Sequence, residues 1–321
     1  MCFPPRVGGP LRGLIFPAFV AALLVCSTAC REKADPPSVD EAKPVAQQPQ
    51  QVESAQSNME RRYQAPQVVV TDTGKRPRRE LRYVLESGVA ERYSSEFTID
   101  YGENRSIRTK VVTRVTHVEP KVEGGYVLEF ELEEYESVRI FGENRDVIPS
   151  SPMMRSRKGR IETDSQCHTS LVSIDSTNIG LAAPLLEGVI ENYRFICEPL
   201  PTEAVGVGAK WQVVYDSKYR GITSIVRRAS VVESMSETGV TLQFDRSENA
   251  KPGTVDTPAG GLLQESKTTE GSGSQQINLS RVAPHTYSYR GQVTSSVRRG
   301  GPEQPEQNST YAVVAELRAL E

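Results

Sequence analysis

A period-two alternation of apolar and polar residues recurs along this chain and restricts most of it to a β-sheet fold. Residues 126–133 alternate apolar with acidic side chains, which places the two kinds on opposite faces of an extended strand. Residues 109–118 are rich in Val and Thr, and a Glu-Gly-Gly turn at 123–125 joins the two segments. The pattern predicts antiparallel strands with one buried face and one solvent-exposed face.

Further strands are predicted at 210–216, 222–232, 275–281, 286–298 and 310–318. The stretches 249–274 and 300–309 contain much Gly, Ser, Thr and Pro, and are predicted to be exposed loops between strands.

The strand unit returns after a constant offset of 114 residues. The matching pairs are Arg114/Arg228, Val118/Val232, Glu119/Glu233, Gly125/Gly239, Leu128/Leu242, Phe130/Phe244 and Glu134/Glu248. A duplication and two similar halves of one curved sheet would both produce this repeat. Two units are too few for a solenoid, which needs at least three. Two related halves are therefore predicted, at about 79–146 and 205–321.

One segment between the halves has the periodicity of a helix. Its apolar rows are Leu181, Leu185, Val189 and Tyr193, and beside them Ala182, Leu186 and Ile190. Pro184 is tolerated only in the first turn, so a helix is predicted near 182–194. The predicted fold is mainly β: a curved antiparallel sheet or half-barrel of two related halves, with this helix packed on a face, where it covers the sheet or closes its opening.

Residues 1–29 have the layout of a secretory signal peptide. A region with two arginines, an apolar run at 14–25 and small residues before Cys30 follow in that order. The apolar run is shorter than the roughly 20 residues that a membrane-spanning helix needs.

The end of this segment resembles the lipobox of bacterial lipoproteins, with Ala29 before the cleavage site and Cys30 after it. The resemblance implies that Cys30 receives a diacylglycerol, and that its new N-terminus is often acylated with a fatty acid such as palmitate. Two or three acyl chains would anchor the chain firmly in a membrane. Ser27 departs from the family pattern, which usually has Leu there. Cys26 is an alternative acceptor, and secretion with simple cleavage after Ala29 is another.

Residues 30–65 are predicted to be the lipidated cysteine and a disordered tether, because they lack large apolar residues until Met59. A β-rich domain is predicted at 66–321. Removal of Arg6 and Arg12 lowers Lys+Arg from 38 to 36 against 41 acidic residues, and so moves the net charge from −3 to −5. This charge argues against general nucleic-acid binding. The expected location is the cell envelope, anchored to a membrane and facing the periplasm or the cell exterior.

Apart from the lipidated Cys30, Cys167 and Cys197 are the only cysteines that remain after such processing. An exported chain meets an oxidising compartment, so an even number of cysteines predicts a disulfide. The alternative is a pair of reduced, buried thiols.

No group of residues in the sequence predicts catalysis, a cofactor or a metal site. Cys167 and His168 are neighbours and would point to opposite faces of a strand, which is poor geometry for a nucleophile and its base. His117 and His285 have no second ligand at metal-binding spacing. The Glu-Gly-Ser-Gly-Ser run at 270–274 is predicted to be a flexible loop without the setting of a nucleophile elbow. The chain is expected not to be an enzyme.

Two charged runs have plain interpretations. Glu129, Glu131, Glu133, Glu134 and Glu136 alternate along a predicted strand, which favours a solvated face over a cation site. Residues 75–79, Lys-Arg-Pro-Arg-Arg, with Arg82 form a basic cluster. This cluster would either contact anionic lipid or an acidic polymer, or simply keep the first strand of the domain soluble.

The most distinctive segment is Pro199-Leu200-Pro201 followed by residues 205–211, Val-Gly-Val-Gly-Ala-Lys-Trp. Pro and Gly enforce turns, after which the only Trp enters a strand as a core residue. This segment resembles one found in a group of uncharacterised bacterial envelope lipoproteins, after a helix and inside a β-rich domain. The resemblance implies no activity. A curved sheet with a helix on its concave side is also remotely similar to the half-barrel of lipoprotein carriers and mycobacterial lipid-binding lipoproteins.

These observations lead to one functional hypothesis and one alternative. The leading hypothesis is a non-enzymatic, membrane-anchored envelope lipoprotein that binds an apolar ligand or lipid in a concave face. The alternative is a structural or protein-interaction module that presents loops such as 249–274 to an envelope partner.

Overall fold

The computed structural model describes residues 58–88, 90–219, 221–250, 253–255, 262–299 and 305–320. Cys30, the predicted signal peptide and most of the predicted tether lie outside this range. The strands are β1 (Asn58–Arg62), β2 (Gln67–Asp72), β3 (Glu91–Asp100), β4 (Arg105–Pro120), β5 (Tyr126–Phe141), β6 (Asn144–Val147), β7 (Lys158–Thr163), β8 (Thr169–Asp175), β9 (Lys210–Tyr219), β10 (Ile222–Met235), β11 (Gly239–Ala250), β12 (Gly253–Val255), β13 (Leu262–Asn278), β14 (Thr286–Arg299) and β15 (Glu306–Leu320). The helices are η2 (Ser151–Met154), η3 (Gly180–Ala182) and α1 (Ala183–Tyr193).

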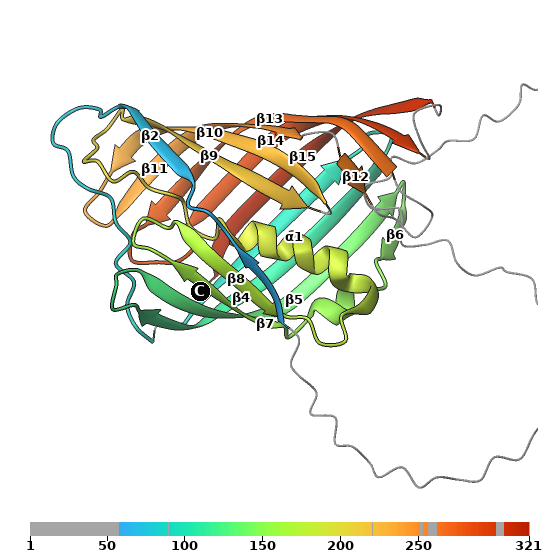
Figure 1. The fold of residues 1–321 in the computed structure, drawn as a ribbon, viewed down its shortest axis with the longest axis horizontal. Coiled ribbons are helices and arrows are strands. Elements are labelled where there is room, and N and C mark those ends of the chain that lie inside the picture. The colour runs from blue at the N-terminus through green and yellow to red at the C-terminus, as the bar shows by residue number, and fades with distance from the viewer. Residues whose placement is uncertain are drawn as a thin grey trace, which may run out of the picture.

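The strands form one curved antiparallel sheet, as predicted, and α1 lies against its concave face (Figure 1). The strand order is β1-β8-β7-β5-β4-β3-β15-β14-β13-β11-β10-β9-β2, with β6 beside β5 and β12 beside β13. The sheet does not close on itself.

The two predicted halves have matching strand registers. Val118 lies opposite Leu128 in the first half, and Val232 lies opposite Leu242 in the second. The next strand continues the match, because Phe130 lies opposite Gly159 and Phe244 lies opposite Gly273. The 114-residue offset therefore relates β5 to β11 and β7 to β13, position by position.

Two matched pairs from the sequence are wrong as structural equivalents. Register shifts follow Val112 and Val115 in β4, whereas the shift in β10 follows Val232. Each bulge moves the following side chains to the other face of the strand. Arg114 and Glu134 are consequently exposed, whereas Arg228 and Glu248 point toward the concave side, where their side chains are only 14% and 12% exposed.

Two expected irregular segments are partly strands. Part of the predicted tether forms β1, so the sheet begins at Asn58 rather than at Pro66. The predicted loop at 249–274 includes β12 and most of β13. β1 is mostly polar, and its strand structure comes from hydrogen bonding to the edge of β8, which a local sequence pattern does not reveal.

A short crossing connects the two edges of the sheet. β1 pairs with β8 at one edge, and β2 pairs with β9 at the other. Only residues 63–66 join these strands, so the two edges approach within roughly 17 Å, the reach of an extended connection of this length. The crossing therefore limits how far the curved sheet can open.

Helix α1 has the predicted position and the predicted apolar face. It buries Leu186, Val189, Ile190 and Tyr193, and Pro184 lies in its first turn. Tyr193 stacks on Phe130 with ring centroids 4.3 Å apart, and its hydroxyl hydrogen-bonds the Thr113 hydroxyl. The helix thus covers the concave face of the first half.

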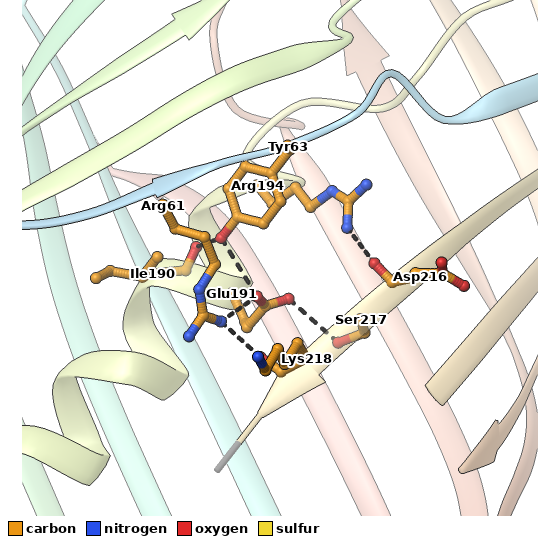
Figure 2. Close-up of polar contacts among 8 residues, drawn as sticks. All are labelled: Arg61, Tyr63, Ile190, Glu191, Arg194, Asp216, Ser217 and Lys218. Carbon is orange, nitrogen blue, oxygen red and sulfur yellow. Dashed lines mark hydrogen bonds and ion pairs between the residues drawn. The ribbon is translucent and has the colours of Figure 1, made fainter. Parts of the chain in front are cut away.

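A polar cluster fastens α1 to both edges of the sheet (Figure 2). The Glu191 carboxylate pairs with Arg61 of β1 and accepts a hydrogen bond from Ser217 of β9 at 3.1 Å. Arg194 donates to the carbonyl oxygens of Asp216 in β9 and of Gln64 in the crossing. Its guanidinium carbon also lies 4.5 Å from the centre of the Tyr63 ring. Loosening α1 would therefore loosen both edges.

The distinctive Pro-Gly segment is hydrogen-bonded to residues 73–79, which follow β2. Arg79 and Val205 exchange backbone hydrogen bonds, and Gly206 donates to the Thr73 carbonyl oxygen. A Cβ on Gly206 would lie 1.9 Å from the Lys75 carbonyl oxygen, so only glycine fits there. Trp211 follows in β9 and is fully buried, as predicted for a core residue.

The predicted disulfide between Cys167 and Cys197 is present, with Cα atoms 5.9 Å apart. It joins the turn before β8 to the segment just after α1. The Glu191 cluster thus fixes the last turn of α1, and the disulfide fixes the segment that follows it.

Replacement of Cys167 and Cys197 by Ser should lower the free energy of unfolding by roughly 3–4 kcal/mol, because a closed loop of about 30 residues is then released in the unfolded chain. Urea denaturation of the variant and of the oxidised wild type measures this difference. Free thiols in the native wild-type protein would contradict the assignment.

Glu191→Ala should lower the free energy of unfolding by about 1–3 kcal/mol, because it leaves Arg61 and Ser217 without their shared acceptor. Glu60→Ala is the matched control, since its pair with Arg62 is exposed and such pairs contribute less than about 1 kcal/mol. Faster amide exchange in β1 should accompany the first change only. Equal effects of both substitutions would show that the cluster does not fasten the edges.

Candidate functional site: the concave face of the second half

The concave face of the second half carries an apolar cluster of its own. Its buried members are Phe244, Tyr289, Val293, Tyr311 and Val313. The partly buried Tyr287 and Ala315 pack against them, as do Ile99 and Tyr101 in and just after β3 of the first half. No α1 residue belongs to this cluster among the residues described. The helix therefore contributes no residue to this cluster, although it packs against β9 of the second half and shares the main core with Trp211 and Leu242.

Glycines in β13 and β14 create space for the aromatic rings. A Cβ on Gly273 would lie 2.5 Å from Phe244 Cζ, and a Cβ on Gly291 would lie 2.3 Å from the Tyr289 hydroxyl oxygen. A Cβ on Gly271 would lie 2.6 Å from the same hydroxyl oxygen. The rings thus lie directly on the sheet backbone. The predicted loop at 270–274 is in fact strand, because these rings cover its glycines.

Arg228 lies on the aromatic layer. Its guanidinium carbon is 3.6 Å from the centre of the Phe244 ring, a close cation–π contact. Its Nη1 atom donates to Glu198 Oε2 at 2.7 Å. The buried Nε and Nη2 atoms have no acceptor among the described residues. One edge of the guanidinium is therefore satisfied, and two of its nitrogens have unused hydrogen-bonding capacity.

Glu198 is held in place by its neighbours along the chain and in space. It follows the disulfide cysteine Cys197, and its backbone N–H donates to the Tyr83 hydroxyl at 3.0 Å. Burial raises the pKa of the Glu198 carboxyl, and the charge of Arg228 only partly offsets this effect.

A second charged group lies next to Arg228. Arg246, directly opposite on β11, pairs with Glu248 at 3.2 Å, and Lys267 pairs with the same carboxylate at 3.1 Å. Burial alone would raise the pKa of Glu248, but the charges of Lys267 and Arg246 outweigh it and lower the pKa. Three cations, Arg228, Arg246 and Lys267, thus face two carboxylates, Glu198 and Glu248. The arrangement favours an anion.

The cations and the apolar residues form a continuous row across the sheet. Partners in register across β3, β15, β14, β13, β11 and β10 are Ile99, Val313, Gly291, Gly271, Arg246 and Arg228. Neighbouring strands are about 4.8 Å apart, so the row extends roughly 24 Å along the sheet. One end is apolar, the other cationic, and the glycines lie between them.

The apolar end is partly open to solvent. Phe97 lies opposite Ala315 on this face and is 41% exposed. At the other end, the Arg246 side chain is 30% exposed. Solvent therefore reaches Phe97 beside the apolar end and Arg246 at the cationic end, whereas Val313 in the row is buried.

Sequence analysis missed Arg228, Arg246 and Glu248 as candidate site residues. A signal was available, because Leu242, Phe244, Arg246 and Glu248 occur at period two and therefore share one face of β11. Charged residues that continue an apolar face are costly to bury unless paired. The repeat concealed this signal, because it matched Arg228 and Glu248 with outward-facing residues of the first half.

The residues considered for chemistry in the sequence do not come together. Cys167 is in the disulfide, and His168 Nδ1 contacts the Asp164 carboxylate at 3.0 Å. His117 and His285 are exposed. No group of three potential metal ligands exists within the described ranges. These histidines therefore suggest no reaction centre.

The two charged runs of the sequence have structural roles. In the acidic run, Glu133 pairs with Arg92 at 2.8 Å, and Glu134 pairs with Lys110 at 3.3 Å. In the basic cluster, Arg78 donates to the Gly74 carbonyl oxygen, and Arg79 donates to the carbonyl oxygens of Ser236 and Glu237. These two arginines stabilise the loops around the Pro-Gly segment.

Two further surface hollows border the sheet, and the lining of the second includes Arg246 and Gly271 of the row. One, of about 330 Å³, is at the end of the β10–β11 hairpin and includes Met235 and His285. Another, of about 440 Å³, is on the convex face and includes Arg227, Asp245 and Glu270. Neither has an apolar lining that extends from strand to strand as the concave row does.

The chain matches no protein-family model, no curated protein and no solved structure. The resemblance to envelope lipoproteins therefore remains a prediction from the sequence. Within the described part of the chain, no helix has the length and apolar character needed to cross a membrane.

Gly273→Ala should lower the free energy of unfolding by about 1–3 kcal/mol, because the added methyl group would lie 2.2 Å from the Ser288 carbonyl oxygen and 2.5 Å from Phe244 Cζ. Gly188→Ala in α1 is the control. Its Cβ would meet only Tyr219 at an ordinary 3.5 Å, and alanine favours helix by up to about 1 kcal/mol. Thermal unfolding compares the two variants, and a neutral Gly273→Ala would contradict the close packing of ring on backbone.

Proposed function

We propose that this protein is a membrane-anchored envelope lipoprotein, lipidated at Cys30, whose concave face binds an apolar ligand such as an acyl chain. The observation that supports the proposal is the second-half apolar cluster, to which α1 contributes no residue although Tyr193 of α1 lies on the equivalent Phe130 of the first half. Exposed Phe97 on the same face supports it, because exposed apolar groups that adjoin a cluster are typical of ligand sites.

The anchor and the location rest on the sequence. The signal-peptide layout and the lipobox-like segment before Cys30 favour export and lipidation. The disulfide at Cys167 and Cys197 is consistent with an oxidising compartment outside the cytoplasm. A lipid-anchored protein in the envelope is close to a supply of acyl chains, which suits an apolar ligand. The proposed role is binding rather than catalysis.

The full chain with Cys30→Ser tests both parts of this proposal. We expect the variant to leave the membrane fraction, because the acyl acceptor is lost, while a Cys26→Ser control stays membrane-bound. Native mass spectrometry of the released protein should then detect a bound amphiphile that organic extraction removes.

Two outcomes would contradict the proposal separately. Persistent membrane attachment of Cys30→Ser would argue against lipidation at this cysteine. A released protein that contains no lipid, and that does not take up fatty acid, would argue against ligand binding in the concave face.

A further inference from the structure

We infer that Arg228 and Arg246 bind the anionic head group, a carboxylate or a phosphate, of the amphiphile that the concave face holds. This inference rests on the proposed function and specifies its ligand class. An acyl chain would lie along the apolar end of the row, from Ile99 to Val313, and the head group would lie at the guanidinium groups.

The geometry of the two guanidinium groups supports an anion. Arg228 and Arg246 are directly opposite each other on neighbouring strands. The Nε and Nη2 atoms of Arg228 and the Nε atom of Arg246 are buried and have no acceptor among the described residues. Arginine presents its N–H groups in a planar fork that matches carboxylate and phosphate oxygens. Three buried donors without acceptors therefore lie on two residues that are in register on neighbouring strands.

The surroundings of the pair supply further polar atoms. The Tyr289 hydroxyl is buried without a partner in the described structure, and it lies over Gly271 and Gly291 in the middle of the row. Thr269 also has a buried hydroxyl without a described partner, and it lies opposite Glu248. These groups adjoin the arginines on the side from which the chain of the amphiphile would approach.

The fold itself does not require these charges. Thr113 and Leu132 are in register in the first half, and Arg228 and Arg246 are in register at the corresponding place in the second. The first half fills this place with uncharged side chains beneath Tyr193. Burying two arginines costs free energy that such side chains avoid. A ligand that uses the charges explains why the second half keeps them.

A purely structural role predicts different behaviour. Arg228 also stacks on Phe244 and pairs with Glu198, so its replacement can change stability in either case. Only a head-group site makes affinity depend on the charge of the ligand. Comparison of amphiphiles that share a chain and differ in head group therefore separates the two roles.

The test uses the full chain with Cys30→Ser, freed of bound lipid, and isothermal titration with four probes. The probes are laurate, dodecyl phosphate, uncharged dodecanol and inorganic phosphate. We expect at least one of the two anionic amphiphiles to bind tenfold or more tightly than dodecanol, because charged hydrogen bonds form only with the anions.

Variants locate the effect. Arg228→Gln and Arg246→Gln should each weaken binding of the anionic amphiphile roughly tenfold and leave dodecanol binding unchanged. Arg227→Gln and Arg114→Gln are matched controls, because Arg227 and Arg114 are exposed on the convex side, and they should change neither affinity. If Arg228→Gln does not fold, the more exposed Arg246 still provides the comparison.

The possible failures are distinct. Equal binding of dodecanol and both anionic amphiphiles by the wild-type sequence would overturn the head-group site and leave the proposed function standing. Absence of binding to any amphiphile would overturn the proposed function. Tight binding of inorganic phosphate alone, sensitive to Arg228, would assign the site to a free anion and overturn the inference.

Discussion

The concave face of a strongly curved sheet is apolar and needs a cover, and this requirement organises the molecule. In the first half, Tyr193 of α1 lies on Phe130 and the helix fills the face. The disulfide fixes the segment just after this helix, and the Glu191 cluster joins the helix to β1 and β9. The crossing at residues 63–66 lies beside its C-terminal end. Each holds the cover in place, so the curvature of the sheet and the position of α1 depend on one another.

The second half meets the same requirement differently. Phe244 occupies the place of Phe130, but a guanidinium group lies on its ring instead of a helical tyrosine. Covering an apolar surface with buried arginines whose donors have no acceptors costs desolvation free energy. Proteins keep such locally unfavourable features mainly at functional sites. The contrast between the two halves is therefore the strongest structural argument that the second half binds a ligand.

Sequence patterns predicted the sheet, the helix and the disulfide because each leaves a local or simple signature: period-two alternation, four-residue spacing and an even number of cysteines. They did not reveal β1, whose strand structure depends on a distant edge. They also misassigned β13, because glycines that receive aromatic rings resemble a loop in sequence. The candidate site was missed because bulges in β4 and β5 shift the register, and a constant sequence offset cannot detect a change of face.

The most direct test of the central claim locates the acyl chain in the protein. Methyl NMR of the Cys30→Ser chain with a fatty acid that carries a spin label on its acyl chain reports which side chains lie near it. The account predicts selective broadening of Ile99, Val293 and Val313, with little effect on Val122 in its exposed turn. Broadening confined to residues outside the concave face, or none at saturating fatty acid, would contradict it.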